Sequence, residues 1–161
     1  MSFNKPIKPA TNIEGVRRSA LWHLGRRDHS ENELREKIGR KTDNQQWIDT
    51  VINECINYGY LNDARFVENF IRSSQNKGFG SKRIKADLKR KGIPAETLFQ
   101  AFAEDQHDYQ QGAASLLSGK YRQRIGNPYL KQKAMIYLQN KGHELDDINN
   151  AIDIHNRAYP E

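Results

Sequence analysis

The chain has 161 residues, of which 36% are hydrophobic and 29% charged, and its formal net charge is +6. The small apolar fraction predicts a lean core, as elongated repeat proteins have. No apolar run approaches the ~20 residues of a membrane span, and the N-terminal residues lack the apolar stretch of a secretory signal. A single cysteine, Cys55, excludes an intrachain disulfide framework. We therefore expect a cytoplasmic protein without a membrane segment.

Apolar residues recur at helical spacing along the chain, and no stretch alternates apolar and polar residues for long enough to predict a strand. An all-α fold is therefore expected. After a mobile N-terminal tail (1–11), predicted helices carry the apolar residues of segments 16–24, 34–38 and 48–52, then 66–71, 84–88 and 98–102, and finally 113–117, 134–138 and 148–152.

Apolar pairs on these helices repeat with an offset of 50 residues, which is typical of stacked supersecondary units. The first set of pairs is Leu34 and Ile38, Ile84 and Leu88, and Ala134 and Leu138. The second set is Ile48 and Ile52, Leu98 and Phe102, and Ile148 and Ile152. We therefore predict three three-helix repeats, over residues 12–61, 62–104 and 105–161.

Residues that begin and end helices stand at the predicted boundaries. Ser30 and Glu33 have the spacing of a capping box, and Asn62 or Asp63 can cap the helix that carries Phe66. The other boundary residues are Pro94, and Pro128 after Asn127, in first helical turns, and Gly92 and Gly142 after basic helix ends.

No catalytic, cofactor or metal site is predicted. The histidines lack the spacing and the cysteine partners of a zinc site, so we expect exposed or partly buried helical residues. They are His23, His29, His107, His143 and His155. Cys55 follows an apolar helix face and is expected to be a buried, inert thiol. Glycine-rich phosphate and dinucleotide motifs are both incomplete, so we expect a protein that is not an enzyme.

Positive charge is concentrated in residues 77–92, where seven basic residues accompany one acidic residue, Asp87. On a helix over residues 81–91, Ile84 and Leu88 mark the buried side. The outward side chains are Lys82, Lys85 and Lys89, with Arg83 and Arg90 in a second row. A merely solvated face usually mixes both signs, whereas one-sided charge favours a polyanionic partner.

Three segments are specific when they occur together: LGRRDHSENEL (24–34), GYLNDARF (59–66), and KGFGSKRI (77–84) with the following KGI (91–93). In order and spacing they resemble the motifs of the RecX family, bacterial regulatory proteins that restrain the RecA recombinase. Asn62 stands where that family usually has aspartate, which keeps a helix cap and removes one charge. The third repeat is similar to the family only in general pattern and length.

The resemblance implies an elongated, curved row of three helical repeats lying in the groove of the RecA–single-stranded-DNA filament. It implies a non-enzymatic inhibitor of RecA that modulates recombination, ATP hydrolysis and SOS coprotease activity. We expect a monomer with weak, sequence-independent contacts to single-stranded and double-stranded DNA. The residues expected to contact RecA or DNA are Lys82, Arg83, Lys85, Lys89, Arg90, Lys91, Arg26, Arg27 and Arg35.

Two other functions make different demands on the sequence. Three-helix units can act as helix-turn-helix modules, so a DNA-binding protein is the alternative. The helix over residues 81–91 offers Ser81, Lys82 and Arg83 at its start and then mainly lysine, which favours phosphate contact over base reading. A nuclease would need a carboxylate cluster for metal ions, and the sequence offers none.

Overall fold

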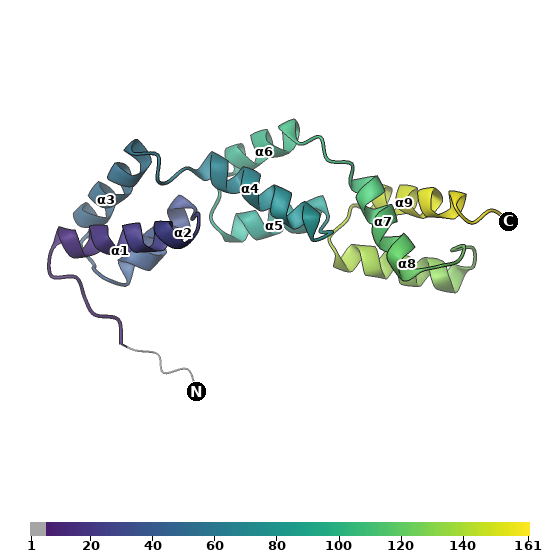
Figure 1. The fold of residues 1–161 in the computed structure, drawn as a ribbon, viewed down its shortest axis with the longest axis horizontal. Coiled ribbons are helices and arrows are strands. Elements are labelled where there is room, and N and C mark those ends of the chain that lie inside the picture. Colours follow the sequence, from purple (N-terminus) through teal and green to yellow (C-terminus); the bar gives the residue numbers. More distant parts are fainter. Residues whose placement is uncertain (1–5) are drawn as a thin grey trace.

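The computed structural model describes residues 6–161, and this part of the chain contains nine α helices and no strand (Figure 1). Residues 1–5, the beginning of the expected mobile tail, lie outside the described residues. The helices are α1 (Ile13–Arg26), α2 (Glu31–Gly39), α3 (Gln45–Asn57), α4 (Asp63–Asn76), α5 (Ser81–Arg90), α6 (Ala95–Glu104), α7 (Tyr109–Lys120), α8 (Pro128–Asn140) and α9 (Leu145–Arg157). The predicted all-α fold is confirmed.

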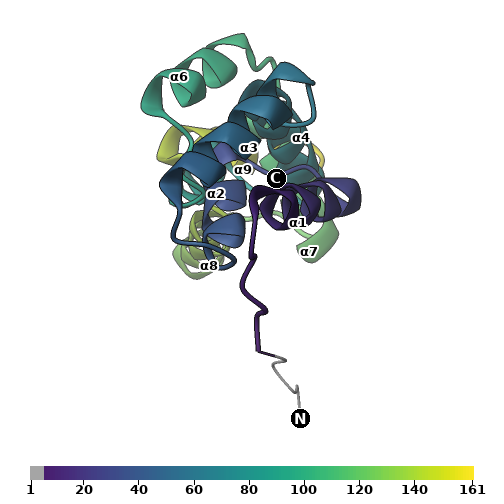
Figure 2. The same ribbon diagram turned by 90° about the vertical axis from the view of Figure 1, so that its left-hand side faces the viewer.

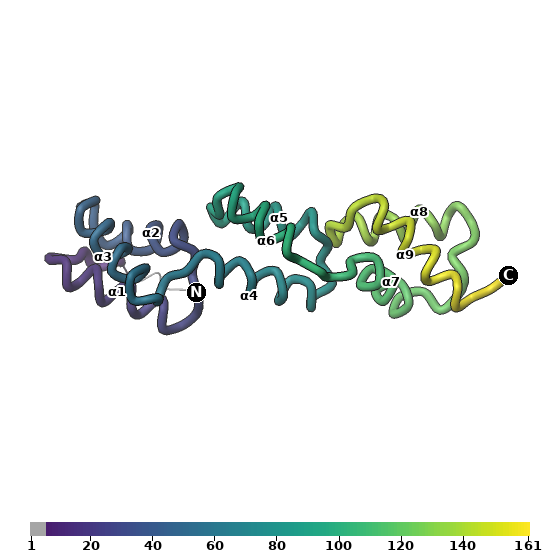
Figure 3. Tube along the Cα trace, turned by 90° about the horizontal axis from the view of Figure 1, so that it is seen from above, coloured from purple at the N-terminus to yellow at the C-terminus, as the bar shows by residue number. Residues whose placement is uncertain are grey.

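The helices form three consecutive three-helix units: unit 1 (α1–α3), unit 2 (α4–α6) and unit 3 (α7–α9). The units follow one another in a row along the longest axis (Figures 1 and 3), and they overlie one another when the row is viewed from its end (Figure 2). Each unit has its own cluster of buried apolar side chains. The core is therefore divided into three small parts, as in a repeat protein whose units contact only their neighbours.

The predicted repeat of apolar pairs corresponds to the second helix of each unit. Leu34 and Ile38 on α2, and Ile84 and Leu88 on α5, are fully buried, and the equivalent pair on α8 is buried equally. On the third helices the equivalent pairs are also buried, except that Phe102 of α6 is half-buried. Because burial of one such aliphatic side chain contributes ~1.5–3 kcal/mol, these pairs hold each second helix in its unit.

Most of the predicted helix boundaries are confirmed. The Ser30 hydroxyl accepts a hydrogen bond from the Glu33 amide, and the Glu33 carboxylate accepts one from the Ser30 amide, which completes the capping box. Asn62, rather than Asp63, caps α4 through the Arg65 amide. Pro94 lies one residue before the first turn of α6, at the N-cap position.

Neighbouring units meet at equivalent places: the N-terminus of one second helix contacts the C-terminal turn of the next second helix. Between units 2 and 3, the Gly80 amide donates to the Lys141 carbonyl at 2.9 Å, and the Lys82 amide donates to the Gly142 carbonyl at 3.1 Å. These bonds satisfy amides at the start of α5, where the structure has no side-chain cap.

Between units 1 and 2, side chains make the corresponding bonds. The Ser30 hydroxyl donates to the Lys91 carbonyl at 3.1 Å, and Asp63 accepts from the Glu31 amide at 2.8 Å. Asp63 therefore satisfies the start of α2, in the preceding unit, instead of its own helix.

Gly92 and Gly142 end α5 and α8 in the left-handed conformation, with φ of 77° and 85°, as predicted for these C-terminal caps. Both are also sites of close approach between units. A β-carbon at Gly92 would collide with Asn32, and one at Gly142 would collide with Arg83. Glycine is thus required at both positions by conformation and by the junction.

The expectation of exposed or partly buried helical residues is wrong at four of the five histidines: His107 is exposed but lies in the loop between α6 and α7, and three others are buried. His29, His143 and His155 are buried, with 3%, 4% and 2% of their surface exposed, and the first two lie in loops rather than helices. Each has a ring nitrogen within hydrogen-bonding distance of a main-chain carbonyl, at Arg27, Gly78 and Gln123 respectively. A buried loop carbonyl needs such a donor, and histidine supplies one while filling apolar space.

Candidate interface with a polyanionic partner

The helix α5 presents the cationic surface expected from the sequence. Lys82, Lys85 and Lys89 are exposed, opposite the buried Ile84 and Leu88. Within residues 6–161, none of the three lysines lies within 4 Å of a carboxylate. Unpaired ammonium groups on one helix face attract phosphates, so these lysines are the strongest candidates on α5.

The two arginines of α5 differ from the lysines because both lie against Asp87. Arg90 pairs with one oxygen of Asp87, and Arg83 lies 3.7 Å from the other. The Arg83 guanidinium also stacks on the Phe79 ring, 3.7 Å from its centroid. Arg83 is therefore fixed beside the junction with unit 3, and Arg90 remains largely exposed.

Lys91 serves the junction between units 1 and 2. Its ammonium donates to Glu33 at 2.8 Å and lies 5.6 Å from the centroid of the Phe70 ring. Burial tends to raise the pKa of the Glu33 carboxyl, but the hydrogen bonds from Lys91 and Arg27 outweigh it and hold that pKa below its usual range. The charge of Lys91 is thus largely balanced within the protein.

The three arginines expected from the first repeat each contact a different side chain. Arg27 pairs with Glu33 at 3.1 Å, and this carboxylate joins it to Lys91. Arg35 pairs with Asp49 at 2.7 Å, and Arg26 lies 4.8 Å from the centroid of the exposed Trp22 ring.

A second cationic surface was missed by the sequence reasoning. A groove of 600 Å³ lies between residues 7–10, α1 and the C-terminal end of α2. Its basic side chains come from three separate segments, so no charge run marks them. They are Lys8, Arg18, Lys37, Arg40 and Lys41. The spacing of Lys37, Arg40 and Lys41 at a helix end was the one available signal.

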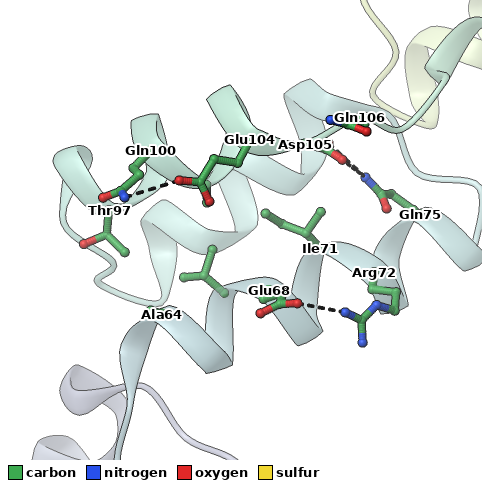
Figure 4. Close-up of a pocket in the computed structure, with 12 residues that line it drawn as sticks. Ala64, Glu68, Ile71, Arg72, Gln75, Thr97, Gln100, Glu104, Asp105 and Gln106 are labelled. Carbon is green, nitrogen blue, oxygen red and sulfur yellow. Dashed lines mark hydrogen bonds and ion pairs between the residues drawn. The ribbon is translucent and has the colours of Figure 1, made fainter.

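The groove between α4 and α6 has the opposite character (Figure 4). It has a volume of 410 Å³, and its carboxylates are Glu68, Glu104 and Asp105. Gln75 donates to both oxygens of Asp105, and Arg72 pairs with Glu68 at 3.0 Å. These carboxylates make the groove a poor site for a polyanion.

The part of the chain that the structure describes has two features that bear on metal and thiol chemistry. It holds no group of three or more side chains suited to bind a metal ion. Cys55 is buried as expected, and burial raises the pKa of its thiol, which disfavours the reactive thiolate.

No helix among residues 6–161 combines the length and apolar character needed to cross a membrane.

Comparison with known proteins agrees with this architecture. The family model described as RecX, second three-helix domain, matches residues 62–104. A regulatory protein RecX from Cronobacter sakazakii is 35% identical over 140 residues, covering 80% of this chain and 85% of the relative. One from Vibrio vulnificus is 32% identical over 137 residues, covering 83% and 88%.

Solved structures show the same fold. The crystal structure of RecX from Lactobacillus salivarius superposes with a TM-score of 0.80 at 23% identity, covering 90% of this chain and 97% of that one. Another RecX crystal structure gives a TM-score of 0.69 at 17% identity, covering 88% and 73%. On the sequence relationships, the chain belongs to the RecX family of regulatory proteins.

Proposed function

We propose that the protein binds the RecA–DNA filament in the cytoplasm and inhibits RecA, thereby modulating recombination and the SOS coprotease activity. It acts as a monomer and without chemistry of its own. The proposal rests on the exposed lysines of α5, Lys82, Lys85 and Lys89, which have no carboxylate partner among residues 6–161. They lie on an elongated row of three units, in a chain of the RecX family. A filament offers a long, polyanion-containing groove, and a row of units can follow it.

The three units are proposed to span residues 12–61, 62–104 and 105–161. Lys82, Lys85 and Lys89 are proposed to face the filament directly. Direct contacts with free single-stranded and double-stranded DNA are weak and independent of sequence.

The alternative, a helix-turn-helix protein that reads bases, has less support. Such a protein inserts the N-terminal part of its recognition helix into the major groove. Here the main chain at the start of α5 is bonded to unit 3, from Gly80 and Lys82 to the turn after α8, and Ser81 is buried, so only Lys82 and Arg83 expose side chains in this turn. The exposed lysines along α5 suit phosphates instead of base edges.

The experiment is to titrate the protein into RecA assembled on single-stranded DNA and to measure ATP hydrolysis and strand exchange. Both rates should fall at substoichiometric amounts, and the protein should co-sediment with the filament. Unchanged RecA activity at a one-to-one ratio, with a sample shown to be folded, would contradict the proposal. Preferred binding to one duplex sequence would favour the alternative.

A further inference from the structure

The groove on unit 1, called here the N-terminal groove, gathers cations from three segments of the chain. Lys8 comes from the residues before α1, Arg18 from α1, and Lys37 from α2, and Arg40 and Lys41 follow α2. The segment before α1 is hydrogen-bonded to the residue Lys41 after α2: the Ala10 amide donates to the Lys41 carbonyl at 2.8 Å, and the Lys41 ammonium donates to the Lys8 carbonyl at 3.2 Å.

The cations of unit 1 are sorted between ion pairs and this groove. Among residues 6–61, Arg17, Arg27 and Arg35 each pair with a carboxylate, within 3.1 Å. The five cations that line the groove have no carboxylate within 4 Å in the described residues, and no acidic residue lines it. The remaining cation, Arg26, stacks on Trp22. Unpaired positive charge in unit 1 therefore converges on the groove and its rim.

An exposed aromatic ring completes this surface. Trp22 follows Arg18 by one helical turn on α1, so both side chains are on the same face of the helix. It lines the groove and is 58% exposed, whereas tryptophan is usually well covered. His23 also lines the groove; burial lowers its pKa, and Lys37, His29, Arg26 and Arg27 lower it further, which agrees with a positive field at this place.

We propose that the N-terminal groove binds single-stranded nucleic acid, with its cations on successive phosphates and Trp22 stacked on a base. Sites for single strands combine these two elements, a cationic groove and an aromatic stacking platform. A duplex keeps its bases stacked inside, so it offers Trp22 no base face. The site adds to the DNA contact of the proposed function and uses no residue of α5.

The test uses the full chain with Trp47→Phe, which leaves Trp22 as the one tryptophan. Adding oligothymidylate of about twelve nucleotides should quench Trp22 emission, because site sizes of this kind are ~4–16 nucleotides. The binding constant should fall with salt at a log–log slope of roughly −2 to −3.5, for about three to five phosphates. Emission that stays unchanged at saturating oligonucleotide would overturn the proposal.

Charge variants separate the groove from other surfaces. A groove variant, Arg18→Ala with Lys37→Ala and Arg40→Ala, should weaken the quenching by at least tenfold. A control variant of equal charge, Arg122→Ala with Lys131→Ala and Arg157→Ala, alters exposed cations of unit 3 and should bind like the parent. Equal loss in both variants would show that only net charge matters, and would overturn the groove site.

Other polyanions show whether the groove recognises a nucleic acid, a phosphate chain or an acidic protein segment. Inorganic polyphosphate should compete with the oligonucleotide without quenching Trp22. Because Trp22→Ala removes the fluorescent probe, its binding is measured by the anisotropy of a dye-labelled oligonucleotide and by competition with polyphosphate. This variant should bind the oligonucleotide more weakly and polyphosphate as tightly as the parent; the same effect on both would overturn the stacking role. Polyglutamate that binds as tightly as the oligonucleotide would assign the groove to an acidic protein segment. RecA inhibition is measured separately, so its absence would contradict the proposed function and leave the quenching result intact.

Discussion

Replacing Gly142 by alanine is expected to separate unit 3 from unit 2 and to destabilise the protein. Gly142 has a φ of 85°, and a left-handed conformation costs an L-residue ~1–2 kcal/mol. The new β-carbon would also collide with the Arg83 side chain, with the Arg83 amide nitrogen and α-carbon only 2.8 and 3.0 Å away. Because backbone atoms surround the site on the Arg83 side, rotation of a side chain cannot relieve the collision.

Relief requires the turn after α8 to move away from α5. The bonds from Gly80 to Lys141 and from Lys82 to Gly142 then lengthen or break, at ~0.5–1.5 kcal/mol each. Together with the conformational cost, the free energy of unfolding should fall by about 2–5 kcal/mol. Such a loss is large for a chain whose core is divided into three small clusters.

Gly119→Ala is the matched control. Gly119 lies in the last turn of α7, has no positive φ, and has no atom within 4 Å of an added β-carbon. Alanine is the better helix former, so this change should stabilise by up to ~1 kcal/mol. Urea unfolding followed by far-UV circular dichroism compares the two, and small-angle scattering reports the arrangement of the units. A Gly142→Ala protein as stable as the control would refute the reasoning about the junction.

The other predictions concern charge and pH. Alanine at Lys82, Lys85 and Lys89 should change stability by at most ~1 kcal/mol, because among residues 6–161 these side chains are exposed and have no carboxylate partner, and only Lys85 lies over an aromatic ring, 4.8 Å from the centroid of Phe102. Inhibition of RecA should nevertheless fall sharply. Inhibition equal to the parent, from a folded sample, would place the contact elsewhere. Burial lowers the pKa of His29 and of His143. Below about pH 6.5 these histidines bind protons in the unfolded chain and stay neutral in the folded chain, which favours unfolding. The urea concentration at the unfolding midpoint should therefore decrease as the pH is lowered from about 7.5 to 5.5, and equal midpoints at the two pH values would contradict this.

The sequence was sufficient for the architecture because local physics sets it. Fully buried pairs such as Ile84 and Leu88 recur at one offset in the chain, and capping residues mark where helices begin. Asp63 shows the limit of such reasoning. It stands at a helix start and has the chemistry of a cap, but its carboxylate satisfies α2 of the preceding unit. Fifty residues later the equivalent position is Ala113, so this contact between units leaves no periodic trace in the sequence.

The same limit applies to the site. Composition located the cationic segment, and the buried pair on α5 located its outward face. Composition could not separate Lys91, which pairs with Glu33 across a junction, from Lys89, which remains unpaired. Nor could it find the N-terminal groove, because that surface exists only after α1 and α2 bring distant residues together.

Net charge is therefore a poor guide to where this protein presents positive potential. In unit 1, the arginines that pair with carboxylates join segments of this unit to one another, and the unpaired cations lie around the groove and Trp22. In unit 2, Asp87 contacts two arginines of α5, and Lys82, Lys85 and Lys89 have no carboxylate partner among the described residues. Because each unit has its own core, the distance between these two surfaces depends on the junction between units 1 and 2. There Ser30 bonds to the main chain after α5, and Asp63 bonds to the start of α2. The affinity of a partner that binds both surfaces at once therefore depends on that junction, since the effective local concentration of the second surface depends on the distance that the partner must span.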